Sequence, residues 1–596
     1  MTRIEARTLN LARLRAELER RGLDGFVVPR SDEHQGEYVP PSAQRLAWLT
    51  GFSGSSGVAV ALRDKAAFFT DGRYTLQAAS EIDGRAFELL HMVEQPPTEW
   101  IATNLPAGAK LGYDPWLHTP DGVAHLKDAC DRAGATLVAC ATNPLDAAWG
   151  DRPAPPLAPI AAHPVALAGR SGADKRAELG AALTKEKIDA AVLTAPDSIA
   201  WLLNVRGGDV PFSPLPLSFA ILHAEGRVEW FVDERKLTPG LGEHLGNGVG
   251  IAPPAAFGAA LDALAGKRVR LDFAAAPAWA LDRLTAAGAR VARGADPCQL
   301  PKACKNEVEL EGARAAHRRD GVALAGFLGW LARTAPGGGL TEIAAADKLE
   351  EFRARGENYR GPSFPTIAGA GPNGAIVHYR ASRESERRIE AGQLFLLDSG
   401  GQYLDGTTDV TRTIAIGAPG AEERRRFTQV LKGHIALATV RFPKGTSGSQ
   451  LDALARLPLW RDGVDYDHGT GHGVGSYLGV HEGPQRISKP ANSQALLPGM
   501  IVSDEPGYYK AGAYGIRIEN LVVVREIDGA AGAEKPVYGF ETLTLAPIDL
   551  ALVERDLLAP AEIEWLNAYH ARVRRAIGPL VDADIARWLE EATRAI

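Results

Sequence analysis

The first half of the chain contains one sequence pattern twice. Three segments recur in the same order: LRAELERRGLDGFVVP (14–29) and KRAELGAALTKEKIDAAVLTAP (175–196), LAWLTGF (46–52) and IAWLLNV (199–205), AAFFTDGRY (66–74) and VEWFVDERK (228–236). The second copy follows the first by roughly 150–160 residues, which is far longer than the period of a solenoid repeat. In the first copy, Leu11, Leu14 and Leu18 have helical spacing, Gly22 ends the helix, and an apolar strand follows. The duplication therefore predicts two related α/β domains.

The length of 596 residues leaves room for more than this pair, because domains contain ~100–200 residues. Two proline-containing stretches, 151–164 and 295–306, disfavour regular structure and mark boundaries. After the second stretch, Asn306 with Glu309 three residues later predicts the capped start of a long helix. We predict four parts: α/β domains at 1–155 and 156–302, a third domain at 303–540, and a C-terminal extension at 541–596 packed on the third domain.

Charge and composition exclude several classes of protein. Lys and Arg number 66 against 73 Asp and Glu, and a net charge of −7 gives no footprint for nucleic acid or an anionic membrane. The charged N-terminus and the absence of any run of ~18 apolar residues predict a cytoplasmic protein without a membrane span. The four cysteines, Cys130, Cys140, Cys298 and Cys304, form no C-x-x-C pair, so we expect reduced thiols.

The unusual polar patterning lies between residues 376 and 520. In LFLLDSGGQYLDGTTDVTRTIAIG (394–417), two strands flank a glycine-containing turn, which predicts a hairpin that brings Asp398 and Asp409 side by side. Taken alone, an aspartate at a strand end is more often a turn residue.

Further candidates follow toward residue 520. In DHGTGHGVG (467–475), alternating glycines around His468 and His472 let the backbone approach a ligand closely, and histidine is the commonest metal ligand. Glu505 precedes a Pro-Gly turn, and Glu519 lies in a predicted buried strand at 514–524. A half-exposed strand would explain Glu519 equally well by itself.

Together these positions supply four carboxylates and one imidazole: Asp398, Asp409, His472, Glu505 and Glu519. Such an oxygen-rich set suits two hard or borderline divalent ions such as Mn²⁺. Without metal, each pair of carboxylates ~4 Å apart would repel by ~4 kcal/mol at an effective dielectric constant near 20. Two divalent ions would cancel that repulsion, although the sequence by itself does not establish that the five residues converge.

The strings LLDSGGQYLDGTTDVTRT, HGTGHGVGSYLGVHEGP, SDEPGYY and GIRIEN resemble the metal-binding signature of the pita-bread metallopeptidases, which include methionine aminopeptidase, prolidase, creatinase and aminopeptidase P. SGSSGVAV, FFTDGRYTLQAA, IAWLLNVRGGDVP, FPTIAGAGPNGAIVHY and LTLAPIDLALVERDLL extend the resemblance to three-domain Xaa-Pro aminopeptidases. The resemblance implies an α/β (α+β) fold with two creatinase-like N-terminal domains and a pita-bread catalytic domain. It also implies a cytoplasmic homodimer that releases the first residue of peptides with proline in second place.

The resemblance also implies individual roles. Asp398 and Asp409 would hold one ion, His472 and Glu505 would complete the second coordination sphere, and Asp409 and Glu519 would contact both ions. Mn²⁺ is expected first, with Co²⁺ or Zn²⁺ as alternatives. The implied catalytic residues are His378, His468, His481 and Glu505, and the implied substrate contacts are Arg73, His378, His481 and Arg517. Arg73 is equally explained as a structural ion-pair partner.

Other readings stay open or receive a plain structural interpretation. Prolidase keeps the metal ligands but cleaves dipeptides only, and some pita-bread relatives are binding proteins that have lost their ligands. GAGPNG (369–374) satisfies G-x-G-x-x-G, but Pro372 and the strand-like AIVHY that follows deny it a helix N-terminus, so we predict a turn. GFSGSSG (51–57) lacks the lysine of a phosphate-binding loop and is predicted to be a tight loop.

Overall fold

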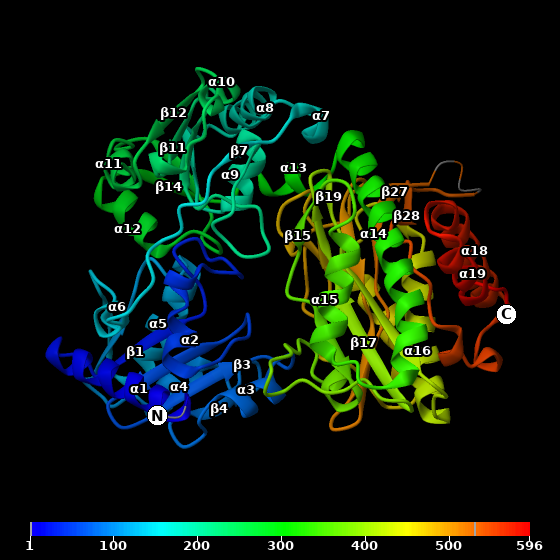
Figure 1. Cartoon of the computed structure of the whole chain (residues 1–596). Coiled ribbons are helices and arrows are strands. Elements are labelled where there is room, and N and C mark those ends of the chain that lie inside the picture. Colours follow the sequence, from blue (N-terminus) through cyan, green and yellow to red (C-terminus); the bar gives the residue numbers. More distant parts are fainter. Residues whose placement is uncertain (1–2, 528, 530–531) are drawn as a thin grey trace. The chain divides into compact units, whose positions relative to one another are not determined.

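The computed structural model describes residues 3–527, 529 and 532–596. The chain forms two compact units, of which the first comprises Met1–Val165 and Arg170–Gln299, and the second Ala166–Gly169 and Leu300–Ile596. Figure 1 shows helices and strands mixed in both units, which confirms the α/β fold class. In the part of the chain that the structure describes, no helix is long and apolar enough to cross a membrane.

The first sheet of the first unit has six strands in the order β4–β3–β2–β1–β5–β6. These are β1 (Gly25–Pro29), β2 (Val58–Leu62), β3 (Ala66–Thr70), β4 (Glu88–His91), β5 (Lys110–Tyr113) and β6 (Thr136–Ala139). The helices are α1 (Arg3–Arg20), α2 (Arg45–Thr50), α3 (Thr75–Glu81), α4 (Pro97–Asn104), α5 (Pro120–Ala133) and α6 (Pro144–Ala148). Leu11, Leu14 and Leu18 of α1 belong to one buried cluster with Phe26 and Phe68 of the sheet, so the helical spacing does mark the core face.

The second sheet repeats this topology strand for strand, in the order β12–β11–β10–β8–β13–β14. Its strands are β8 (Ala190–Leu193), β10 (Phe219–His223), β11 (Val228–Phe231), β12 (Val249–Ala252), β13 (Arg268–Leu271) and β14 (Arg290–Arg293). The central strand β1 pairs antiparallel with β2 and parallel with β5. Its counterpart β8 likewise pairs antiparallel with β10 and parallel with β13. The helices α8 (Gly172–Lys185) and α9 (Pro196–Leu203) correspond to α1 and α2. The structure thus confirms that the sequence duplication is a duplicated fold.

The second unit begins with the predicted capped helix. α14 (Glu307–Thr334) starts after Asn306, whose side chain accepts hydrogen bonds from the amides of Val308 and Glu309. The Glu309 side chain in turn accepts from the Asn306 amide at 3.0 Å, which completes the capping box. α15 (Glu342–Arg353) packs against α14.

The strands that matter for the site belong to two sheets and a hairpin. β16 (Ile367–Ala370), β17 (Gln393–Ser399) and β20 (Val410–Ile416) form one antiparallel sheet. A second sheet has the order β21–β28–β27–β24–β22–β23, and β25 (Gly507–Lys510) pairs with β26 (Tyr514–Arg517). The strands of the second sheet are β21 (Phe442–Pro443), β22 (Gly471–Gly473), β23 (Glu482–Ile487), β24 (Ile501–Asp504), β27 (Asn520–Glu526) and β28 (Val537–Thr542).

Two predicted strands are wrong in detail. The predicted continuous strand at 514–524 is interrupted, because β26 ends at Arg517 and β27 begins at Asn520. Glu519 lies at this crossing between two sheets, where its amide donates to the Thr411 carbonyl oxygen at 3.2 Å. In the strand-like AIVHY (375–379), Ala375 ends a short 3₁₀ helix at Gly371–Ala375, and the next three residues form a bend and a turn. GAGPNG thus leads into a single 3₁₀ turn and not into an α-helix.

The C-terminal helices, drawn in red in Figure 1, pack on the rest of the second unit. These helices are α18 (Pro560–Ile577) and α19 (Ala583–Ala592). Leu566 and Ile577 share one buried cluster with Phe427 and Leu431 of α16 (Ala421–Thr439). The extension is therefore held by apolar burial, while the exact boundaries at 155, 302 and 540 stay predictions. All four cysteines are free thiols.

Candidate metal centre

The five predicted ligands come from five different places in the second unit. Asp398 lies near the end of β17, and Asp409 immediately precedes β20, which pairs antiparallel with β17 as the predicted hairpin requires. His472 is the middle residue of β22, Glu505 follows β24, and Glu519 lies between β26 and β27. Because β22, β24 and β27 are neighbours in one sheet, the latter three side chains are brought to the same region.

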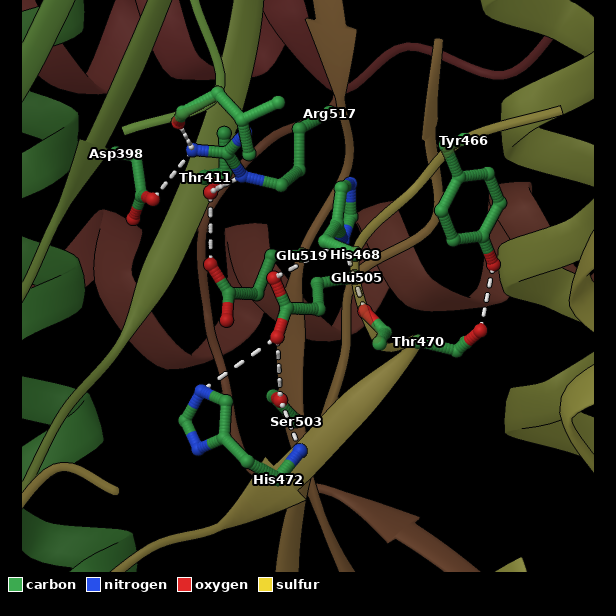
Figure 2. A network of polar contacts seen from close by, with 12 residues as sticks. Asp398, Thr411, Tyr466, His468, Thr470, His472, Ser503, Glu505, Arg517 and Glu519 are labelled. Atoms are coloured by element: carbon green, nitrogen blue, oxygen red, sulfur yellow. Dashed lines mark hydrogen bonds and ion pairs between the residues drawn. The ribbon is translucent and has the colours of Figure 1, made fainter. Parts of the chain in front are cut away.

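The structure brings these side chains together. One ligand atom each of Asp409, His472 and Glu519 lie within 4.8 Å of one another. His472 Nε2 lies 3.4 Å from Asp409 Oδ2 and 3.5 Å from Glu505 Oε1. Figure 2 shows Asp398, Glu505, Glu519 and His472 within one network of polar contacts. Asp398 Oδ1 is buried and has no hydrogen-bond partner among the described residues, so one carboxylate oxygen in the group remains available.

The raised pKa values of the clustered carboxyl groups reflect how unfavourable this crowding of negative charge is. Burial raises the pKa of Asp398 to about 6. The positive charge of Arg517 lowers this pKa, but the negative charge of Asp409 raises it further. Burial likewise raises the pKa of Glu505 and, together with the Asp409 and Asp398 carboxylates, raises the pKa of Glu519 well above its ordinary value. Without cations, these carboxyl groups therefore hold protons more tightly than exposed ones do.

His472 likewise holds its proton more tightly than an exposed histidine does. Burial disfavours its charged form, but the Asp409 and Glu505 carboxylates outweigh that effect and raise the pKa of His472 to about 9. A site that binds a proton so firmly between carboxylates is also suited to bind a metal cation, which can replace the proton. The donor set, four carboxylates and one imidazole, fits two divalent ions of the Mn²⁺ type.

Neutral hydroxyl groups orient two of the carboxylates. Thr411 Oγ1 donates to Glu519 Oε2 at 2.7 Å. Ser503 Oγ donates to Glu505 Oε1 at 3.0 Å and accepts from the His472 amide at 2.9 Å, so it links two predicted ligands (Figure 2). Neither residue was predicted from the sequence. Their signal was weak: Thr411 lies two residues after Asp409, and Ser503 two residues before Glu505.

Arg517 and His468 lie behind the carboxylates in a hydrogen-bonded chain. Arg517 is 1% exposed, and its Nη2 lies 2.6 Å from Asp398 Oδ2, while its Nη1 donates to the Tyr509 hydroxyl at 2.5 Å. The Tyr509 hydroxyl lies 2.8 Å from His468 Nε2, and His468 Nδ1 lies 4.0 Å from Glu505 Oε2. Arg517, predicted as a substrate contact, thus contacts a predicted ligand, and Tyr509 was not among the predicted residues.

The other predicted substrate residues have varied settings. His481 is exposed and meets the His472 ring edge-on, with ring centroids 4.2 Å apart. His378 is half-buried in the turn that follows the 3₁₀ segment. Arg73, in the first unit, makes a two-pronged ion pair with Asp71 at 2.9 and 2.8 Å, as the structural alternative requires.

Comparison with known proteins places the chain in a family. Residues 311–526 match the model of metallopeptidase family M24, residues 10–145 and 151–309 match creatinase/prolidase N-terminal domains, and residues 536–596 match the C-terminal region of peptidase M24. A solved structure of X-prolyl aminopeptidase from Caenorhabditis elegans, described as a cytosolic enzyme with a di-nuclear active site, is 35% identical and covers 99% of this chain and 100% of its own, with a TM-score of 0.94.

Two curated relatives are similar along nearly their whole length. The probable Xaa-Pro aminopeptidase P of Aspergillus niger is 42% identical over 98% of each chain. That of Paracoccidioides brasiliensis is 41% identical, again over 98% of each chain. Identity at this level along the full length, together with the M24 match, shows that the chain belongs to the Xaa-Pro aminopeptidase P family of metallopeptidases.

Proposed function

We propose that the protein is an Xaa-Pro aminopeptidase, which hydrolyses the first peptide bond of peptides that have proline in second place. The observation that carries the proposal is the convergence of Asp409, His472 and Glu519 in a chain of this family, with Asp398 and Glu505 in the same polar network. The physiological partner would be a peptide, and we further propose a cytoplasmic homodimer with the four-part division given above.

The proposed ligands are Asp398, Asp409, His472, Glu505 and Glu519, and the proposed ions are two divalent cations, Mn²⁺ first and Co²⁺ or Zn²⁺ as alternatives. When bound, such ions would neutralise the carboxylates, lower the pKa of a water molecule and polarise a peptide carbonyl group. Proton transfer, stabilisation of the oxyanion and orientation of the substrate are proposed to depend on side chains of the protein.

Glu505 is the proposed general base. Its Oε1 accepts from Ser503 at 3.0 Å, which leaves Oε2 to take a proton from the attacking water. His468 Nδ1 lies 4.0 Å from that Oε2, and the Tyr509 and Arg517 side chains connect His468 to Asp398. The proton taken up by Glu505 must be delivered to the proline nitrogen when the C–N bond breaks, and His468 is proposed to help shuttle it. Arg517 stays protonated, so it would fix Tyr509 and, through it, His468, and would not carry the proton itself.

The exposed His481 would donate a hydrogen bond to the oxyanion that develops on the scissile carbonyl, and His378 would orient the peptide on its proline side. The proline nitrogen has no N–H for a peptidase to bind, so these side-chain contacts replace the usual backbone recognition. Arg73 is proposed to bind the downstream part of longer peptides, and Arg517 to hold Asp398.

The test is a comparison of an Xaa-Pro dipeptide, an Xaa-Pro-Yaa tripeptide and an Xaa-Ala-Yaa tripeptide, each with Mn²⁺, Co²⁺ and Zn²⁺. We expect release of the first residue from the proline tripeptide and little from the alanine peptide. Cleavage confined to the dipeptide would overturn the proposal in favour of prolidase. If none of the three peptides were cleaved with any of the three metals, the enzyme proposal would fail and a binding function would remain.

A further inference from the structure

A buried carboxylate next to His481 is held by two lysines that lie far away in the sequence. Lys302 belongs to α13 (Gln299–Ala303), and Lys305 directly precedes the cap of α14. Lys302 Nζ donates to Glu482 Oε2 at 2.8 Å, and Lys305 Nζ donates to Glu482 Oε1. The three side chains are 2%, 1% and 1% exposed. Each oxygen of the Glu482 carboxylate thus has its own ammonium donor.

The free energy of folding alone does not account for this cluster. Burying ionised lysine and glutamate side chains carries a desolvation penalty that their mutual attraction commonly does no more than offset. Apolar side chains of similar volume would fill the same space at least as favourably. What two directed ammonium groups provide, and apolar packing does not, is a fixed position for one carboxylate and hence for the backbone that carries it.

That backbone leads directly into the candidate site. Glu482 begins β23 and lies opposite Gly473 of β22, the residue after His472. A side chain at Gly473 would collide with the Glu482 carbonyl oxygen, so the two strands approach unusually closely here. His481, the residue before Glu482, places its ring edge-on against the His472 ring, with centroids 4.2 Å apart and planes at 82°. His481 itself is exposed, and the backbone at 482 is one of the features that place it.

The lysine segment is in turn fixed to the sheet that carries Glu505. The Lys305 amide donates to the Gly499 carbonyl oxygen at 3.0 Å, and Cys304 forms a β-bridge with Met500. Residues 499 and 500 lead directly into β24, after which Glu505 follows. The segment that carries the two lysines is therefore fixed to the same stretch of chain that leads through β24 to Glu505, the proposed general base.

We propose that Lys302, Lys305 and Glu482 form a clamp that positions His481 over His472 for the proposed peptidase reaction. The lysines are positioning residues, since they touch Glu482 and act through its neighbour His481. This inference rests on the proposed function, because it assigns the clamp to the step in which His481 meets the scissile carbonyl oxygen.

The test uses Lys302→Met in the full-length, metal-loaded enzyme with an Xaa-Pro-Yaa peptide. Lys305 remains to pair with Glu482, so the carboxylate does not become an unpaired buried charge. We expect kcat to fall on the order of ten- to a hundredfold, as for other residues that orient catalytic groups, with a smaller change in KM. Metal content after gel filtration should stay at the wild-type value, because no proposed ligand loses a contact. Lys302→Arg should recover most of kcat.

The matched control is Lys348→Met, which removes a lysine paired with Glu351 at 2.6 Å on the partly exposed surface of α15. Its kcat should equal that of the wild type. The decisive comparison repeats Lys302→Met in a His481→Ala background, where its effect on kcat should shrink to within about twofold because both changes act on one group. An unchanged kcat in Lys302→Met, or the same loss with and without His481, would overturn the inference.

Should Lys302→Met not fold, Lys305→Met provides the same comparison with the other lysine retained. The two proposals fail in different ways. A wild-type enzyme that cleaves proline peptides together with a fully active Lys302→Met variant refutes the clamp alone. A wild-type protein that cleaves no such peptide with any of the three metals refutes the proposed function, and the clamp with it.

Discussion

Thr411→Val is the substitution that most directly tests how the candidate metal centre is held. The Thr411 hydroxyl donates to Glu519 Oε2 at 2.7 Å and accepts from Arg517 Nε at 3.1 Å, and Thr411 is 0% exposed (Figure 2). Valine keeps the branched shape but offers neither bond. A hydrogen bond to a charged group contributes about 1.5–3 kcal/mol, and removal of an outer partner of a metal ligand weakens metal binding by roughly 10–100-fold. We therefore expect a loss of Mn²⁺ affinity of that size.

The assay is calorimetric titration of chelator-treated protein with Mn²⁺, with activity followed at each metal concentration. Thr413→Val is the matched control, because Thr413 lies two residues along the same strand and therefore on the same face. Its hydroxyl exchanges hydrogen bonds, both 3.0 Å long, only with the Arg517 backbone in the described structure. The control should lose about 1 kcal/mol of stability but keep its Mn²⁺ affinity. Equal Mn²⁺ affinity in Thr411→Val and the wild type would refute the assigned role of Thr411.

Three further predictions concern catalysis, buried charge and pH. Glu505→Gln should keep the fold and much of the metal yet lose most turnover; near-normal kcat would exclude Glu505 as the base. Arg353→Met removes the ion-pair partner of Asp320, which lies 2.7 Å away, with both side chains at most 3% exposed, and leaves that carboxylate the neutral Tyr403 hydroxyl as a donor. The free energy of unfolding in urea should fall by about 3–5 kcal/mol, and a loss below ~1 kcal/mol would contradict this. Burial lowers the pKa of His118 to about 4, so on acidification the unfolded chain binds a proton at His118 before the folded protein does. The free energy of unfolding should therefore fall by up to about 3 kcal/mol as the pH decreases from 6.5 to 4. His118→Gln should flatten this part of the profile of Tm against pH; the same slope in both proteins would rule out His118 as its source.

Several features of the fold are encoded locally and were predictable for that reason. The repeated helix and strand patterns of the first unit became two sheets with the same strand order, because hydrophobic periodicity fixes which face of each element is buried. Asn306 and Glu309 are three residues apart, so their capping box depends on one helical turn only. The identity of the donor residues at 398, 409, 472, 505 and 519 could likewise be read from short motifs.

Other features depend on which elements pack together, and the sequence did not reveal them. The strand predicted through Glu519 is broken there, because the chain leaves the β25–β26 hairpin and enters a different sheet. The resemblance implied that Arg517 contacts substrate, which stays a prediction, and no motif spacing revealed its buried ion pair with Asp398, 119 positions away.

The sequence by itself determined the duplicated α/β architecture, the helix caps and the chemical types of the candidate ligands, since each depends on residues close together in the chain. Only the tertiary structure decided what holds those ligands and the neighbouring His481. Thr411 meets Glu519 across 108 positions, and Lys305 meets Glu482 across 177. Spacing along the chain carries no information about such pairs, because their distance is set by how separate sheets and helices pack, and packing is a property of the whole folded unit.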